Sequence, residues 1–242
     1  MVIDEITKNT LKLFSERCKT FGIDDWLQTY ANHQIPDHID PFTLRYFDNE
    51  KFYRNGLLRN NVRLAAIKMA SFSLITNEWV DELVKEMVKY SYKKPEDLHV
   101  IEVMAGLGAL TKALRDRGIN CTACDLRKDV LILDYENNSW IDDINIISAQ
   151  QMLRTYNTPH EVDFIICSWP RIFAGICDVL DIMHEKYPQA LLIYIGEGIT
   201  GCCAEMDFFN KSELVKKPIK LNELYPSWYE LSDFIGFYNK KI

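Results

Sequence analysis

The sequence predicts an α/β fold, in which helices cover both faces of a mainly parallel β-sheet. Apolar runs of strand length recur through the second half of the chain, and helical patterns separate them. The first of these runs ends in a glycine turn, Ala105-Gly106-Leu107-Gly108, which leads directly into a helical pattern. Strands that alternate with helices predict a parallel sheet, because each helix returns the chain to the end of the sheet at which the previous strand began, so successive strands run in the same direction.

The order of elements follows from periodicity and from the glycine and proline residues between the patterns. The first 94 residues predict helices, over 4–20, 23–33, 60–75 and 78–87, the last capped by Thr76 or Asn77. The apolar runs after them predict strands over 100–103, 119–124, 144–147, 162–167 and 190–195. Helices are expected over 109–117, 150–156, 171–186 and 202–215, and the tail suggests two last strands, 218–221 and 233–238, as an antiparallel pair.

Length and charge limit the organisation of the chain. Its 242 residues suffice for one sizeable core or for a core domain with an accessory one. We expect a helical lid or substrate region over 1–94 and the sheet domain over 95–242. The net charge of −7 argues against a protein that coats nucleic acid, and the excess lies in the second region, at −8 against +1 in the first.

Cysteine usage indicates a reducing compartment, and we expect a cytoplasmic protein. Seven cysteines form no disulfide framework, the first residues do not resemble a secretory signal, and no apolar run is long enough to cross a membrane. Cys121 and Cys124 have the spacing of a metal or redox pair. On a strand they would point to opposite faces, so the sequence favours structural cysteines, and we expect no metal.

Basic residues alternate with aromatic residues between positions 43 and 68. This pattern could hold a planar or phosphate-bearing substrate, but a helix with aromatic residues in the core and bases in solvent is the favoured interpretation. The basic residues are Arg45, Lys51, Arg54, Arg59, Arg63 and Lys68.

The first glycine turn carries the strongest functional signal. The turn lies in the pattern Glu102-x-x-Ala105-Gly106-x-Gly108-Ala-Leu-Thr, followed by Asp125, and this pattern resembles motif I of class I S-adenosylmethionine-dependent methyltransferases. The local sequence is similar to that of ribosomal-RNA adenine dimethyltransferases. The resemblance implies a Rossmann-like, seven-stranded methyltransferase sheet after an N-terminal helical region, with S-adenosylmethionine as cofactor. It also implies cofactor contacts in the glycine turn and beside the second strand, by Glu102, Ala105, Gly106, Gly108, Asp125 and Leu126.

These residue types suit that cofactor chemically. A carboxylate such as Asp125 can accept two hydrogen bonds from the ribose diol. Glu102 would place a negative charge near the sulfonium and ammonium groups. The family has glycine where this chain has Met104, so either the turn is altered or this side chain narrows the pocket.

The ends of the later strands supply the other candidates. The resemblance implies a contact with the adenine edge at the third strand end, by Ser148 and Ala149, with Gln150; the alternative is a simple helix start. Ser168-Trp169-Pro170 resembles the acceptor element of amino-group methyltransferases, although Arg171 replaces its aromatic residue; the alternative is a strand-to-helix turn with proline at the helix start. Glu197 could orient a nucleophile or accept its proton, or could be a solvated loop acid. Cys202 and Cys203 have no histidine nearby to activate them.

The sequence therefore favours a methyltransferase that acts on a nitrogen acceptor: a base, a small molecule or a protein side chain. The catalytic candidates are Ser168, Trp169, Pro170 and Glu197. An inactive methyltransferase-like binding or scaffold protein is the alternative, and Met104 and Arg171 favour it. An NAD-dependent oxidoreductase is a weaker one, because Thr111 occupies the position of the third glycine. We expect no membrane partner.

Overall fold

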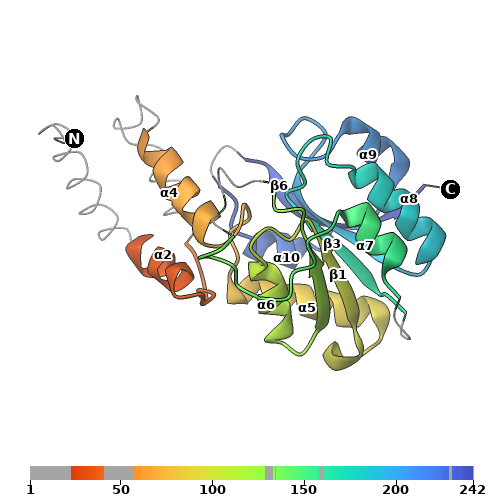
Figure 1. Ribbon diagram of the computed structural model, residues 1–242, viewed down its shortest axis with the longest axis horizontal. Helices are drawn as coiled ribbons and strands as arrows, with labels where there is room; N and C mark the ends of the chain where they lie inside the picture. Colours follow the sequence, from red (N-terminus) through yellow and green to blue (C-terminus); the bar gives the residue numbers. More distant parts are fainter. Residues whose placement is uncertain are drawn as a thin grey trace, which may run out of the picture.

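The computed structural model describes residues 23–40, 57–128, 133, 135–157, 161–228 and 231–241, and confirms the α/β class (Figure 1). The helices are α2 (Ile23–Ala31), α4 (Leu57–Met69), α5 (Asn77–Ser91), the 3₁₀ helix η2 (Pro95–Asp97), α6 (Ala109–Arg115), α7 (Ala149–Thr155), α8 (Ile176–Lys186), α9 (Met206–Lys211) and α10 (Ile219–Leu224). The strands are β1 (His99–Val103), β2 (Asn120–Cys124), β3 (Phe164–Ser168), β4 (Leu191–Glu197), β5 (Ser212–Lys216) and β6 (Asp233–Lys240). The helix expected over 4–20 and the bases Arg45, Lys51 and Arg54 lie outside these ranges.

The sheet has the order β2-β1-β3-β4-β6-β5. Its first four strands are parallel, and β6 pairs antiparallel with both β4 and β5. The chain moves outward from β1 to β2 and then returns to place β3 on the other side of β1. Ligands of open α/β sheets bind at such a reversal, beyond the carboxyl ends of the two strands.

The expected seventh strand is reduced to one bridge in the described chain. Asn145 pairs in parallel with Cys124, and its side-chain amide donates to the carbonyl of Ala123. The Ile147 amide then donates back to the Asn145 carbonyl, which turns the chain away from the sheet. The prediction of seven strands was therefore wrong for the described residues, where six strands form the sheet.

The tail is an antiparallel pair, as expected, but its first strand was misplaced. Residues 212–215, expected at the end of a helix, lie in the edge strand β5, while 219–221, expected in a strand, begin the helix α10. A short apolar segment cannot be assigned from periodicity alone, and pairing with β6 decides it here. Pro218, at the N-cap of α10, is typical of a helix start.

Helices α4 and α8 are shorter than predicted at the functional edge. Helix α4 ends at Met69, so residues 70–76 form a connection rather than a last turn of helix. Helix α8 starts only at Ile176, because Phe173 and Gly175 adopt left-handed conformations with φ of 63° and 85°. Thr76 is the N-cap of α5 without a side-chain cap bond. The Asn77 side-chain amide donates to the Ile35 carbonyl and to Asp37 Oδ1.

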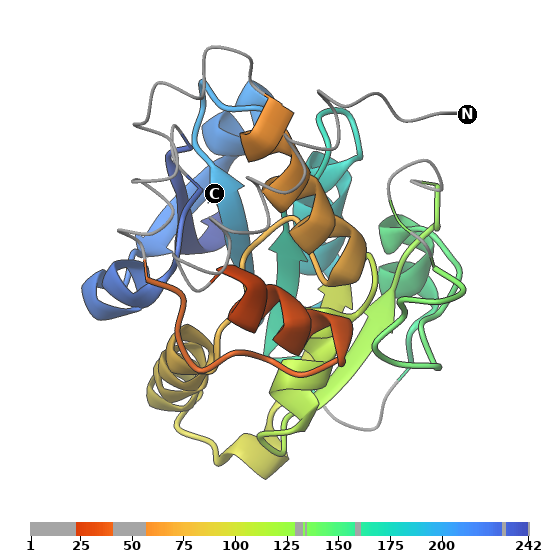
Figure 2. The ribbon, with the colours of Figure 1, turned by 90° about the vertical axis from the view of Figure 1, so that its left-hand side faces the viewer.

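Two apolar clusters lie on the two faces of the sheet. Alternate strand residues enter opposite clusters, as with Ile193 and Tyr194. Cys121 and Cys124 also enter opposite clusters, as expected from their spacing on a strand. The cysteines of the described chain form no disulfide. In Figures 1 and 2, α7, α8 and α9 cover one face, while α2 and α4 lie across the end of the sheet.

Buried residues of the N-terminal helices join the same cluster as the sheet. Trp26 of α2, Trp79 of α5 and Phe164 of β3 all belong to it. The division at residue 94 stays a prediction. Within the ranges that the structure describes, no helix combines the length and apolar character that crossing a bilayer requires.

Candidate functional site

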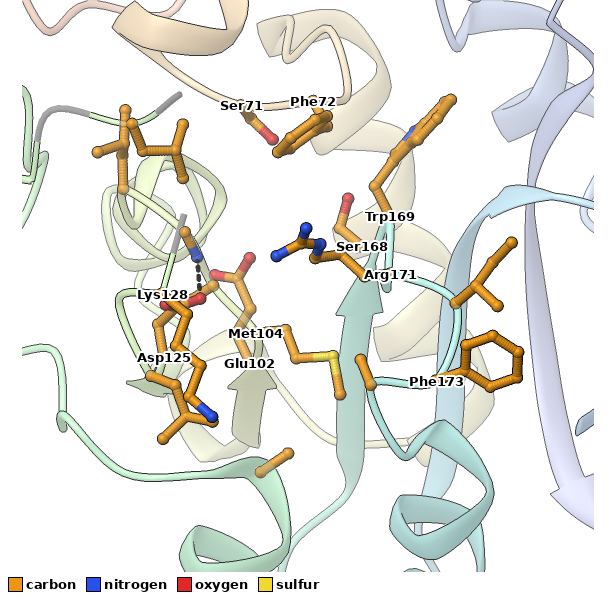
Figure 3. Close-up of a pocket in the computed structure, with 18 of the residues that line it drawn as sticks. Ser71, Phe72, Glu102, Met104, Asp125, Lys128, Ser168, Trp169, Arg171 and Phe173 are labelled. Carbon is orange, nitrogen blue, oxygen red and sulfur yellow. Dashed lines mark hydrogen bonds between the residues drawn. The ribbon is translucent and has the colours of Figure 1, made fainter. Parts of the chain in front are cut away.

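A cavity of about 400 Å³ opens at the carboxyl ends of β1 and β3, where the strand order reverses (Figure 3). This volume lies within the usual range for small-molecule sites. Its walls come from the glycine turn, the segment after β2, the start of α7, the segment after β3 and the connection after α4. They include Glu102, Met104, Ala105, Gly106, Asp125, Leu126, Lys128, Ala149, Gln150, Ser168, Trp169, Arg171, Phe173, Ser71 and Phe72.

Glu102 is a buried carboxyl group at the inner end of the cavity. It is only 2% exposed, and its Oε2 accepts a hydrogen bond from the equally buried Thr111 hydroxyl. Burial raises the pKa of Glu102 to about 7, against the opposing effect of this hydrogen bond. The group is therefore poised to lose its proton near neutral pH when a cation enters the cavity.

The turn after β1 keeps left-handed backbone at three alternate positions. Met104, Gly106 and Gly108 have φ of 58°, 57° and 80°. A Cβ at Gly108 would stand 2.7 Å from Cγ1 of Ile141, so this glycine is required for space as well as for conformation. Met104 adopts the left-handed conformation although it carries a Cβ. Its side chain forms part of the cavity wall, with Sδ 3.8 Å from Cys167 Sγ.

Backbone strain is concentrated around this cavity. The described chain has six non-glycine residues with left-handed φ, and four of them, Met104, Arg127, Trp169 and Phe173, follow β1, β2 or β3 at this edge. Each such residue costs about 1–2 kcal/mol. Strain of this kind persists where surrounding structure enforces it, and its concentration here supports a functional role for the cavity.

Replacing Met104 by glycine is expected to widen the cavity and relieve strain together. We expect S-adenosylmethionine to bind several-fold more tightly and the free energy of unfolding to change by no more than about 1 kcal/mol, because relief of left-handed strain offsets lost side-chain packing. Met104→Ala is the matched control, since it widens the cavity but keeps the strain. Titration calorimetry and thermal unfolding of both variants measure this; weaker binding by the glycine variant would contradict it.

Asp125 connects the glycine turn to the segment after β2. Its Oδ2 accepts from the Gly106 amide at 2.9 Å, and Oδ1 accepts from the Arg127 amide at 2.5 Å and the Tyr135 hydroxyl at 3.4 Å. The carboxylate is thus held in place by the backbone of the glycine turn and of the segment after β2. Leu126 lines the cavity beside it and is 44% exposed.

The 148–150 segment was predicted either to contact the adenine or to begin a helix, and the structure places its residues differently. Ser148 is the N-cap of α7, where its hydroxyl accepts from the Gln151 amide at 3.0 Å, and it does not line the cavity. The helix-start interpretation therefore accounts for Ser148. Ala149 and Gln150 do line the cavity, and the Gln150 amide is oriented by Asp178 at 3.3 Å.

The end of β3 brings Ser168 and Trp169 to the cavity. The Ser168 hydroxyl lies 3.1 Å from that of Ser73, and Arg63 of α4 stands 5.5 Å from the centre of the Trp169 ring. Pro170 is buried but does not line the cavity. It precedes α8 by six positions, so it does not mark a helix start, contrary to the alternative interpretation.

Glu197 lies outside the cavity, contrary to what a catalytic role predicts. Its Oε2 accepts from the Cys202 amide at 2.9 Å and its Oε1 from the Ser232 amide at 3.5 Å. Partial burial works to raise the pKa of Glu197, but these bonds hold it below its usual range. Glu197 therefore does not line the cavity, and it is partly buried rather than fully solvated. Burial raises the pKa of Cys203 to about 12, which agrees with the expectation that these thiols are not nucleophiles.

Several cavity residues were not found from the sequence. Ser71 and Phe72 come from the connection that the sequence assigned to a helix, and Lys128 follows the predicted Asp125. Figure 3 shows the Arg171 side chain extending toward the middle of the cavity, while Trp169 and Phe173 point away from it. The serines on either side of Phe72, which interrupt the apolar spacing between two helical patterns, were the available signal in the sequence for Ser71 and Phe72.

Glu102 and Asp125, together with the glycine turn between them, therefore form one wall of a cavity at the reversal of the sheet. The fold resembles solved methyltransferases. Magnesium protoporphyrin IX methyltransferase of Synechocystis PCC 6803, solved with bound SAM, is 13% identical, with a TM-score of 0.41 over 84% of this chain and 98% of that one. The 23S rRNA methyltransferase ErmE is 16% identical, with a TM-score of 0.38 over 66% and 68%.

A third solved structure is similar to the same degree. Ribosomal protein L11 methylase from Lactobacillus delbrueckii subsp. bulgaricus is 15% identical, with a TM-score of 0.39 over 69% of this chain and 81% of that one. No family model and no curated protein matches the sequence. Similarity at this level carries no argument about activity, so the function is argued from the residues of the cavity.

Proposed function

We propose that this protein is an S-adenosylmethionine-dependent methyltransferase. The observation that carries the proposal is the pair of carboxyl groups beside the left-handed turn, Glu102 buried at 2% exposure and Asp125 held by the Gly106 amide. The cofactor carries two positive groups and a vicinal diol, which are what a buried acid and an oriented carboxylate bind. The cavity is large enough for such a ligand.

Each cofactor group has a matching part of the cavity. Asp125 would accept hydrogen bonds from the ribose hydroxyls, and Glu102 would face the positive charges of the amino-acid end. Ala105 and Gly106 let the backbone approach this end, and Leu126, Ala149 and Gln150 would flank the base. When bound, S-adenosylmethionine supplies an electrophilic methyl group on a sulfonium.

The acceptor side would lie between the end of β3 and the connection after α4. Ser168 and the backbone carbonyls of the Trp169-Pro170 segment can accept hydrogen bonds from an amine, so we favour a nitrogen acceptor. Phe72 and Ser71 would close this side and exclude water. Methyl transfer mainly requires in-line positioning in a desolvated pocket, so the absence of Glu197 from the cavity lining does not count against it.

Two further expectations belong to this proposal. The free cysteines of the described chain agree with a cytoplasmic location. The acceptor could be a base, a small molecule or a protein side chain, and we propose no membrane partner.

Binding measurements test the proposed function directly. Titration calorimetry with S-adenosylmethionine, S-adenosylhomocysteine and NAD should give binding of the first two only. Binding of NAD alone would overturn the proposal in favour of an oxidoreductase, and binding of none would favour the scaffold alternative, which the Met104 side chain in the cavity supports.

A co-crystal with S-adenosylhomocysteine would then show which groups line the acceptor side. We expect Ser168→Ala to retain cofactor affinity within about threefold, because Ser168 already bonds Ser73 and faces the acceptor side. Loss of cofactor binding in that variant would place Ser168 on the cofactor side instead.

A further inference from the structure

A second cluster of reactive side chains lies at the end of β4, apart from the cavity. One ligand atom from each of Glu197, Cys202 and Cys203 lies within 4.8 Å of the others. None of the three lines the cavity, and the proposed methyltransferase chemistry uses none of them. The cluster therefore needs its own explanation.

The loop that carries the two cysteines is fixed on Glu197 by close backbone contacts. The Gly201 amide donates to the Gly198 carbonyl at 2.9 Å, and the Cys202 amide donates to the Glu197 carboxylate at 2.9 Å. A Cβ at Gly201 would stand only 2.1 Å from Cβ of Glu197, so glycine alone allows the loop to fold this tightly. The three side chains are brought together by the loop itself.

The Glu197 end is held from the sheet side as well. The Tyr194 hydroxyl donates to the Glu197 carbonyl at 2.5 Å, and the Ser232 amide reaches the other carboxylate oxygen at 3.5 Å. Hydrogen bonds to the ligands of a metal site orient them and are part of its affinity. This carboxylate is thus oriented before any ion arrives.

Cysteine sulfur and carboxylate oxygen are both ligand types that zinc accepts, and thiolate ligands favour zinc over the harder divalent ions. Cys203 is only 2% exposed, Glu197 is half-buried and Cys202 is exposed, so the cluster has a fixed inner side and an open outer side. An ion can enter from solvent, and three protein ligands leave a fourth tetrahedral position for water.

We propose that Glu197, Cys202 and Cys203 bind one Zn²⁺ ion. Binding replaces the two thiol protons, which pass to solvent, and forms two zinc–sulfur bonds and one zinc–oxygen bond. The thiols are neither oxidised nor reduced. The ion would fasten the Gly198–Gly201 loop to the end of β4.

Metal titration of the reduced full-length chain tests the proposal. We expect one equivalent of Zn²⁺ to be taken from a chromophoric chelator, and Co²⁺ to give sulfur-to-metal charge-transfer absorption together with the visible bands of a tetrahedral site. Cys202→Ser and Cys203→Ser should each weaken Zn²⁺ binding at least about 100-fold, and Glu197→Gln about 10-fold. Cys177→Ser is the matched control, because Cys177 also lies near a carboxylate, 3.9 Å from Glu205, but outside the cluster.

Several results would overturn the proposal. One is failure of the wild-type chain to bind Zn²⁺ stoichiometrically. Another is Zn²⁺ binding by the two cysteine variants that is as tight as that of the wild type. The third is a Cys202–Cys203 disulfide that persists under mild reductant, which would show a redox pair instead. The wild-type cobalt spectrum remains decisive if a variant fails to fold. S-adenosylmethionine binding does not enter the test, so its outcome is independent of the proposed function.

Discussion

Glu102→Gln is expected to stabilise the protein above neutral pH and to remove its affinity for S-adenosylmethionine. Burial raises the pKa of Glu102 from 4.5 to about 7, so the ionised form is disfavoured in the folded protein without ligand. Glutamine keeps the shape and an acceptor for the Thr111 hydroxyl, but it never carries the charge. A gain in stability and a loss of binding should therefore arise from the same substitution.

The pH window follows from the direction of this shift. Between pH 4.5 and about 7 the folded protein holds a proton that the unfolded chain has released, so the stability contributed by this group falls as the pH rises. Below this window glutamate and glutamine are both neutral, and the variant should match the wild type. Above it the free energy of unfolding of Glu102→Gln should exceed that of the wild type by about 3 kcal/mol.

The affinity of the wild-type protein should follow the opposite trend. A bound cation favours the carboxylate, so S-adenosylmethionine should bind more tightly as the pH rises through 7 and should release a proton near pH 6. Calorimetry in buffers of different ionisation enthalpy measures this proton. In Glu102→Gln the release should vanish and the affinity should fall at least about 100-fold, as expected for loss of a charged partner in a buried site.

Glu82→Gln is the matched control for these measurements. Glu82 is also buried, but it lies on α5 and pairs with Lys220 at 2.9 Å, and this bond holds its pKa below its usual value. Its replacement should lower stability at pH 8 and leave cofactor binding unchanged. A Glu102→Gln variant that lost stability at pH 8 in the same way would show that Glu102 is paired in the folded protein, contrary to our expectation.

The fold could be predicted where glycine and strand periodicity agree, and not where tertiary pairing decides. The turn from β1 to α6 depends on glycines and on one long helical pattern, and it lies where the sequence placed it. Residues 212–216 became a strand because β6 offers an open edge, which no local pattern reveals. The seventh strand was lost because Asn145 turns the chain after a single bridge.

The residues of the candidate site also differ in whether the sequence could predict them. Glu102, Asp125 and Ser168 line the cavity, as the strand ends predicted. The other strand-end candidates Ser148, Pro170 and Glu197 do not line it. Phe72 was missed because it lies in the connection between α4 and α5, far in sequence from the strand ends that line the rest of the cavity. The effect of Met104 also required the structure, since a non-glycine residue can adopt a left-handed turn only where neighbouring structure enforces it.

Asp125→Ala is expected to lower both the stability of the protein and its affinity for S-adenosylmethionine, because this carboxylate holds the turn and would also bind the ribose. Without it the amides of Gly106 and Arg127 lose their acceptor, which should cost about 1–3 kcal/mol of unfolding free energy. The ribose hydroxyls would lose their acceptor as well, so we expect affinity for S-adenosylmethionine to fall at least about 100-fold. Chemical denaturation and calorimetry measure the two effects independently.

Two further variants show which task dominates. Asp125→Asn keeps one acceptor oxygen for the backbone, so it should recover part of the stability while binding remains weak. Asp143→Ala removes an exposed aspartate that pairs with Arg115 outside the cavity, and it should cost less than about 1 kcal/mol and leave affinity unchanged. If Asp125→Ala lost stability but bound S-adenosylmethionine as the wild type does, the carboxylate would serve only to hold the turn, and the ribose contact would have to come from another residue.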